Sequence, residues 1–306
     1  MWRYAAGRTL QALVAILGVL TIVFVVMRAA GDPTLLLVPQ GASAEAIDAL
    51  RHNLGFDRPW IVQYAEYLRD LARLDLGVSV VQHIPASDIV ASRLPYTLEL
   101  ASGALLIAAG FGIPVGVLMA TGRGGWVAGL LGTLVLAGQS MPSFLSGILL
   151  IAVFGVVLGW LPTSGADDLQ ALVLPSLALG ALSMASFARM TRIAVLDELG
   201  RDHVRAARAR GLSMTQTVLR HVLRNAAIPV VTVAALEIGN LLAGSVIVET
   251  VFAWPGIGQL AIQSIEARDF LVVQAVVLLV SAVHVATSLA ADLAYALIDR
   301  RIRLAR

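Results

Sequence analysis

The chain has 306 residues, of which 58% are hydrophobic and only 14% are charged. A soluble protein of this length could not bury so much apolar surface, so the composition indicates a membrane protein. All 22 basic residues are arginine, which excludes a P-loop lysine, a Schiff base and a lysine general base. Because the sequence has no cysteine, disulfides, thiolate nucleophiles and cysteine-bound metals are also excluded.

Long apolar stretches recur along the chain, and a helix needs about 20 apolar residues to cross the hydrocarbon core. Five stretches predict such helices, at 9–27, 100–120, 169–188, 226–252 and 270–291. The fourth of them contains two acidic residues, Glu237 and Glu249. A further stretch, 124–166, is uncharged for 43 residues and fits either one long kinked helix with an apolar loop or two tightly joined helices.

The distribution of arginine decides between these two alternatives. With six spans, 15 of the 22 arginines fall on one side, which the positive-inside rule assigns to the cytoplasm. Seven spans would export the arginine-rich stretch 189–224. We therefore predict an all-α, polytopic protein with six transmembrane helices and both termini in the cytoplasm. A kink is expected at Met141-Pro142, where proline removes a backbone donor.

The first span could instead be a cleaved signal peptide, because Arg3 and Arg8 give it a basic start. Its uncharged stretch of 19 residues exceeds the usual apolar core of about 7 to 15 residues, so a retained helix is preferred.

The stretch 29–95 is too long for a simple connection and predicts a helical insertion outside the cytoplasm. Ser43 can cap a first short helix, and Gly55 suits its left-handed end. A second helix begins near Pro59 and carries an apolar stripe that consists of Trp60, Tyr64, Tyr67, Leu68 and Leu71. Packing at the membrane surface is favoured over a docking surface for this stripe.

The stretch 189–229 interrupts the apolar pattern with eight arginines and is expected to form helix, turn, helix. Residues 197–210 can be helical, Gly211 ends that helix, and Ser213 caps a second one. The second helix has an apolar face that consists of Met214, Val218, Val222 and Leu223.

In the first of these helices, alanines alternate with arginines, giving a helix that is thin on one side and charged on the other. Its residues are Arg205, Ala206, Ala207, Arg208, Ala209 and Arg210. A thin helix can enter a protein cleft. In the alternative interpretation these arginines only fix the topology or contact anionic lipid.

Several polar residues fall within the predicted spans, where burial in lipid is costly. Glu237 and Asn240 are three residues apart on one helix face and are candidates for lining a passage; Gln139 and Ser140 can join them at a broken helix. In the alternative, each bonds only to a neighbouring helix, the interpretation preferred for His284 and Asp292. An ion-coupled transporter would instead use the carboxylates as a relay.

The segments 202–213 and 220–232 resemble the cytoplasmic EAA loop of ABC importer permeases, in the form found in the dipeptide, oligopeptide and nickel branch. Arg205 replaces the signature glutamate, as in that branch. Similar segments cover nearly the whole chain, at 31–33, 54–59, 63–64, 75–79, 93–100 and 248–258. The chain departs from the family at Leu74, where glycine is usual, which affects a local turn.

The resemblance implies a type I ABC importer permease fold with four regions. These are the N-terminus with the first span (1–28), the insertion (29–95), the transmembrane core (96–298) with its coupling loop (189–229), and a cytoplasmic tail (299–306). It also implies the first permease subunit of a binding-protein-dependent importer in the bacterial inner membrane. Such a subunit forms half of a passage for di- or oligopeptides or similar small solutes and catalyses no bond chemistry.

The partners implied are a second homologous permease, two cytoplasmic ATPases, an extracytoplasmic solute-binding protein and membrane lipid, with no nucleic acid. No cofactor is expected on this chain, since ATP and Mg²⁺ belong to the ATPases. The ATPases are expected to grip Arg205, Ala206, Ala207, Arg208, Ala209, Arg210, Gly211, Leu212 and Ser213.

Overall fold

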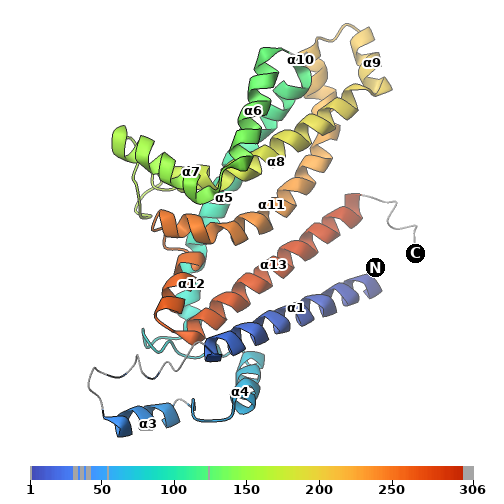
Figure 1. The fold of residues 1–306 in the computed structure, drawn as a ribbon. Coiled ribbons are helices and arrows are strands. Elements are labelled where there is room, and N and C mark those ends of the chain that lie inside the picture. The colour runs from blue at the N-terminus through green and yellow to red at the C-terminus, as the bar shows by residue number, and fades with distance from the viewer. Residues whose placement is uncertain are drawn as a thin grey trace. The chain divides into compact units, whose positions relative to one another are not determined.

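The computed structural model describes residues 2–29, 34, 38, 43–53, 55–122 and 125–298, without the side chains of 289–298 and of some residues in two other helices. Across these residues the chain is helical, with one isolated β-bridge between Val78 and Pro85 and no strand. It folds into two compact units. One combines Met1–Pro95 with Gly256–Val285, and the other combines Tyr96–Pro255 with Ala286–Arg306 (Figure 1).

Among the described residues, four helices are long and apolar enough to cross a membrane. They are α5 (Ala86–Thr121), α8 (Val173–Leu199), the helical stretch Met214–Val251 that ends in α11 (Leu223–Val251), and α13 (Phe270–Ile298). The predicted first span lies in α1 (Trp2–Ala29), whose apolar part in the described portion of the helix, Val14–Ala29, is shorter. The prediction of a helical, polytopic membrane protein is confirmed.

A bent pair of helices adds a fifth span if its two arms together cross the membrane once. The pair consists of α6 (Trp126–Ser140) and α7 (Ser143–Leu150), and α7 continues as a π-helix, η1 (Ile151–Val157). The two arms are bent by 107°. The break lies at Met141-Pro142, where the sequence predicts it, because both residues adopt extended backbone that ends α6 and begins α7. The bend is much sharper than the expected kink.

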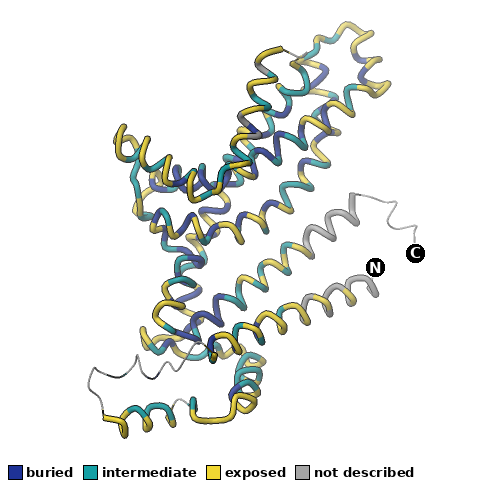
Figure 2. The backbone as a smooth tube through the Cα atoms, in the orientation of Figure 1, coloured by how far each residue is buried: buried dark blue, intermediate teal, exposed yellow. Residues whose placement is uncertain are grey.

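The unit that contains α8 is built around that helix, as the buried stretch of α8 in Figure 2 shows. On one side α8 meets α5 so closely that side chains are excluded at the contact points. A Cβ atom added to Gly116 would lie 2.5 Å from the carbonyl oxygen of Ala188, and one added to Gly180 would lie 2.7 Å from that of Ala104. Small residues allow such close approach of helices in membranes. The glycines of α5 that approach α8 are Gly103, Gly112 and Gly116.

The other unit contains the insertion predicted at 29–95. Its helix α3 (Ala44–Asn53) follows Ser43, whose Oγ accepts a hydrogen bond from the Ala46 amide at 3.3 Å, and Gly55 has φ +71°. Helix α4 (Trp60–Ala72) packs the rings of Tyr64 and Tyr67 against Phe24 of α1, with centroids 5.2 and 5.9 Å apart. Trp60 is 52% exposed and does not belong to the packed stripe.

The same unit contains a helix that the sequence did not predict, α12 (Ile257–Glu266). Its Ile257 and Leu260 form a core with Ile89 at the start of α5 and with Val272 of α13. Helix α13 also packs against α1 (Figure 1), where Phe270 and Val273 meet Met27. The predicted tail, 299–306, lies outside the described residues.

Helix α4 ends in a turn whose backbone is left-handed at a leucine. Leu74 has φ 60° and follows the C-cap residue Arg73. The amide of Asp75 donates to the carbonyl of Asp70 at 2.9 Å, the bond that closes a Schellman-type helix end. Glycine is the usual residue at this position, because a Cβ atom is crowded there. Leu74 therefore holds a strained backbone conformation.

We expect Leu74→Gly to raise the free energy of unfolding by about 1 kcal/mol, because glycine adopts a positive φ without steric cost. The matched control is Ala72→Gly, in the last helical turn, which should lower the same free energy by up to about 1 kcal/mol. Thermal unfolding of the detergent-solubilised chain measures both. Shifts of the two midpoints in the same direction would contradict the strained turn.

Gly116→Val should lower the free energy of unfolding by about 1 to 3 kcal/mol, because the added carbons would push α5 away from α8. Gly110 lies on the same helix, and a Cβ atom added there would meet nothing within 4 Å. Gly110→Val is therefore the control and should leave the unfolding midpoint nearly unchanged. Equal effects of the two variants would show that α5 and α8 do not touch at Gly116.

Candidate functional site

The arginine-rich stretch forms a helical hairpin between α8 and α11, which we call the arginine hairpin (residues 200–222). It consists of α9 (Asp202–Ala209), α10 (Met214–Thr217) and a short π-helix, η2 (Val218–Val222). The prediction of helix, turn, helix is confirmed, but the first helix begins later than residue 197. Asp197 and Glu198 belong to the last turn of α8, which ends at Leu199.

Helix α9 has a packed side and an exposed side. Val204 and Ala207 are each 1% exposed, and Val204 joins a core with Val195 of α8 and Val222 of η2. The residues exposed on α9 and just beyond it are Asp202, His203, Arg205, Ala206, Arg208, Ala209 and Arg210. Ala207 therefore does not belong to the outer surface with Ala206 and Ala209.

The turn of the hairpin follows the predicted local signals. Gly211 has φ +88°, a conformation that glycine adopts freely. Ser213 begins α10 with a reciprocal capping box: its Oγ accepts from the Gln216 amide at 3.3 Å, and its own amide donates to Gln216 Oε1 at 3.2 Å. Leu212 between them is half-buried. In the following helix Val218 and Val222 are buried, as predicted.

A single carboxylate ties the hairpin to the two long helices. Glu198, at the end of α8, accepts a hydrogen bond from Asn225 of α11 at 2.6 Å. Its oxygens also lie 3.1 Å from His203 Nε2 of α9 and 3.7 Å from Arg201 Nε. The Glu198 side chain is 13% exposed. No local pattern in the sequence marks this cluster, because its members are spread over 28 positions, from 198 to 225.

The carboxylates of α11 are turned into the protein. Glu237 is 8% exposed and accepts a hydrogen bond from Ser183 of α8 at 2.6 Å. Asn240 is exposed, so the two residues do not share one environment. Glu249 is fully buried and accepts from Thr97 of α5 at 2.8 Å. Each carboxylate therefore links α11 to a neighbouring helix, which offsets part of its burial cost.

The break between α6 and α7 borders an apolar cavity of ≈ 370 Å³. Met141 at the break lines it, together with Ile107 of α5, Phe154 of η1 and Gly180 of α8. Beside the break, Gln139 accepts a hydrogen bond from the guanidinium of Arg189 on α8. Ser140 is exposed. Gln139 and Ser140 therefore lie at a broken helix. The residues that line the cavity include neither this pair nor Glu237 and Asn240.

Two further polar residues singled out in the sequence, His284 and Asp292, belong to α13. His284 is exposed on the helix, and the side chain of Asp292 lies outside the described residues. Among the described residues, no group of three or more histidine or acidic side chains is arranged to hold a metal ion.

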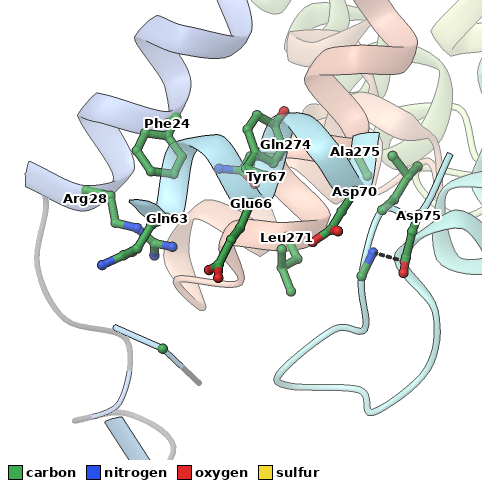
Figure 3. Close-up of a pocket in the computed structure, with 13 residues that line it drawn as sticks. Phe24, Arg28, Gln63, Glu66, Tyr67, Asp70, Asp75, Leu271, Gln274 and Ala275 are labelled. Carbon is green, nitrogen blue, oxygen red and sulfur yellow. Dashed lines mark hydrogen bonds between the residues drawn. The ribbon is translucent and has the colours of Figure 1, made fainter. Parts of the chain in front are cut away.

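A smaller cavity of ≈ 180 Å³, lined by both polar and apolar side chains, lies in the unit that contains α4 (Figure 3). Glu66 and Asp70 of α4 line it, together with Asp75, which accepts a hydrogen bond from the Gly77 amide at 2.9 Å. Burial raises the pKa of Tyr67, which also lines the cavity, to about 12, so the phenol stays neutral at physiological pH. Arg58, which does not line the cavity, pairs with Glu66 at 2.5 Å.

Two family models match the chain over almost its full length. Residues 112–304 match the binding-protein-dependent transport system inner membrane component, and residues 1–101 match the N-terminal region of such membrane components. A match over more than half of the chain establishes the family.

Individual proteins agree with these matches. The chain is 45% identical over 288 residues to the glutathione transport system permease protein GsiC of Escherichia coli O6:H1, covering 94% of each. It is 42% identical over 304 residues to the GsiC protein of Salmonella paratyphi A, covering 99% of each. A solved structure of the MetNI methionine ABC transporter, in an inward-facing conformation, superposes with a TM-score of 0.58 at 23% identity, over 69% of this chain and 96% of that one.

The helices long enough to span a membrane, the arginine hairpin and this shared fold define a permease subunit of an ABC importer. The chain belongs to the family of binding-protein-dependent transport system inner membrane components. Members of this family are transport permeases of the inner membrane, and the ATPase of such a system is a separate subunit.

Proposed function

We propose that this chain forms half of the passage of an importer for small peptides, as the first of two homologous permease subunits. The identity to glutathione permeases over 94% of the chain supports a cargo of short peptides or peptide-like solutes. In this proposal the chain has six spans and both termini in the cytoplasm. The regions are those implied by the sequence: first span (1–28), insertion (29–95), core (96–298) and tail (299–306).

The observation that carries the proposal is the two-sided character of α9. Its outer surface presents small alanines between arginines, a shape that fits a cleft lined by acidic groups on a partner. Its inner surface packs against α8 and η2 through Val204, and Ala207 on the same side is also buried. A partner that binds the outer surface can therefore move the membrane helices through the inner one. We assign this partner as a cytoplasmic ATPase, one for each permease, holding residues 205–213.

ATP and Mg²⁺ would be bound by the ATPases, while this chain transmits movement. An extracytoplasmic binding protein would deliver the solute, and closure of the ATPases would tip the two permeases between inward-open and outward-open states. Gln139, Ser140, Glu237 and Asn240 remain candidates for lining the passage. Asn240 and Ser140 are the more accessible members, because both are exposed while Glu237 is buried and Gln139 is half-buried.

Ala206→Glu should release the ATPases without unfolding the chain, because Ala206 is exposed and a bulky acid would block the thin side of α9. Recovery of the ATPases on affinity purification of the co-expressed, detergent-solubilised complex should fall about tenfold, which corresponds to about 1.4 kcal/mol. Recovery of the second permease should be unchanged.

Two variants serve as controls for this experiment. Ala267→Glu introduces the same exposed charge in the other unit, just after α12, and should not affect recovery of the ATPases. Ala207→Glu places a charge in the packed side and should reduce the yield of folded chain itself. Full recovery of the ATPases with Ala206→Glu would contradict the assigned docking surface.

A further inference from the structure

Within the arginine hairpin, helix α9 is attached to the rest of its unit by few buried side chains. Helix α9 has eight residues and buries only Val204 and Ala207. Short non-α segments join it to α8 at Gly200 and Arg201 and to α10 at residues 210–213. A short helix between two such joints can rock unless further contacts fix its orientation. Small apolar burial alone gives little resistance to a tilt, because the hydrophobic effect has no direction.

Glu198 supplies the directional contacts. It is the last acidic residue of α8, and its carboxylate meets His203 of α9 at 3.1 Å and Asn225 of α11 at 2.6 Å. Hydrogen bonds to a charged group are shorter and stronger than those between neutral groups. Because the side chain is only 13% exposed, solvent screens these contacts weakly. One side chain therefore joins three helices at the base of the hairpin.

We propose that Glu198 is the positioning residue that makes α9 move together with α8 and α11, so that movement of the ATPase reaches the membrane helices. The inference rests on the proposed function and adds a residue that touches neither the ATPase nor the solute. Without Glu198, α9 still binds its partner through the outer surface, but it tilts on its joints. ATP is then hydrolysed with less solute moved per cycle.

The first test measures the mobility of α9 in the full chain by itself. Because the chain has no cysteine, Arg208→Cys gives a single attachment point for a nitroxide spin label on the exposed side of α9. In lipid nanodiscs, Glu198→Ala should increase the mobility of the label. Asn225→Ala, which removes one partner from the other side, should act in the same direction. Glu198→Gln keeps an acceptor oxygen and should give a smaller increase than Glu198→Ala.

The second test measures solute transported per ATP hydrolysed by the complete importer in proteoliposomes. With Glu198→Ala, this ratio should fall about fivefold or more, the lower end of the range for coupling between two sites. ATPase recovery and the hydrolysis rate should stay close to the unmodified values. The control is Asp202→Asn, which removes a negative charge from a side chain of α9 that is 99% exposed and should change neither mobility nor the ratio.

The outcomes separate this inference from the proposed function. If the unmodified chain recovers no ATPases, the proposed function is wrong, while the spin label still decides whether Glu198 positions α9. An unchanged label mobility with Glu198→Ala would overturn the inference. So would an unchanged ratio of solute to ATP in a complex that assembles normally.

Discussion

The close packing of α5 against α8 is the contact on which the unit that contains them depends. Gly116 and Gly180 bring the two backbones within reach of one another, so that α8 is fixed along much of its length. From α8 the other helices of this unit take their positions through polar side chains. Ser183 binds Glu237 of α11, Arg189 binds Gln139 of α6, and Glu198 binds Asn225 at the start of α11.

This arrangement explains how charged groups can be accommodated among apolar helices. A buried carboxylate in a membrane is costly unless a neighbouring helix supplies a donor. Glu237 and Glu249 both have such a donor, from α8 and α5 respectively. These hydrogen bonds account for both glutamates as links between helices. A proton or cation relay is therefore not needed to explain why α11 carries two acids.

The sequence predicted the features that depend on local chemistry. Apolar stretches gave the long helices, Pro142 gave the position of the break, and Gly211 with Ser213 gave the turn of the hairpin. Features that depend on a distant neighbour were missed. Nothing in the sequence distinguishes Ala207 from Ala206, because only the packing of α9 against its neighbours in the fold buries one and exposes the other.

The limits of the helices and their packing were hard to predict for the same reason. Helix α8 ends at Leu199, and the next residue is Gly200. Its φ of −75° is ordinary for a helix, so α8 does not have the left-handed glycine end from which helix ends are usually predicted. Glycines lower the stability of an isolated helix, so the sequence alone does not explain those of α5. Their role in close packing becomes clear only when Gly180 and Ala188 of α8 are seen to contact α5. The amphipathic helix α12 is only ten residues long and was not predicted, because it lies between two much longer apolar stretches, 226–252 and 270–291.

In the proposed function, this chain transmits the work of ATP hydrolysis from partner subunits to a solute passage. The most direct test is uptake of a labelled short peptide into proteoliposomes that contain both permeases and both ATPases, with the binding protein supplied. We expect uptake that requires ATP and persists when ion gradients are collapsed. Uptake driven by an ion gradient through the permease without the ATPases would contradict it.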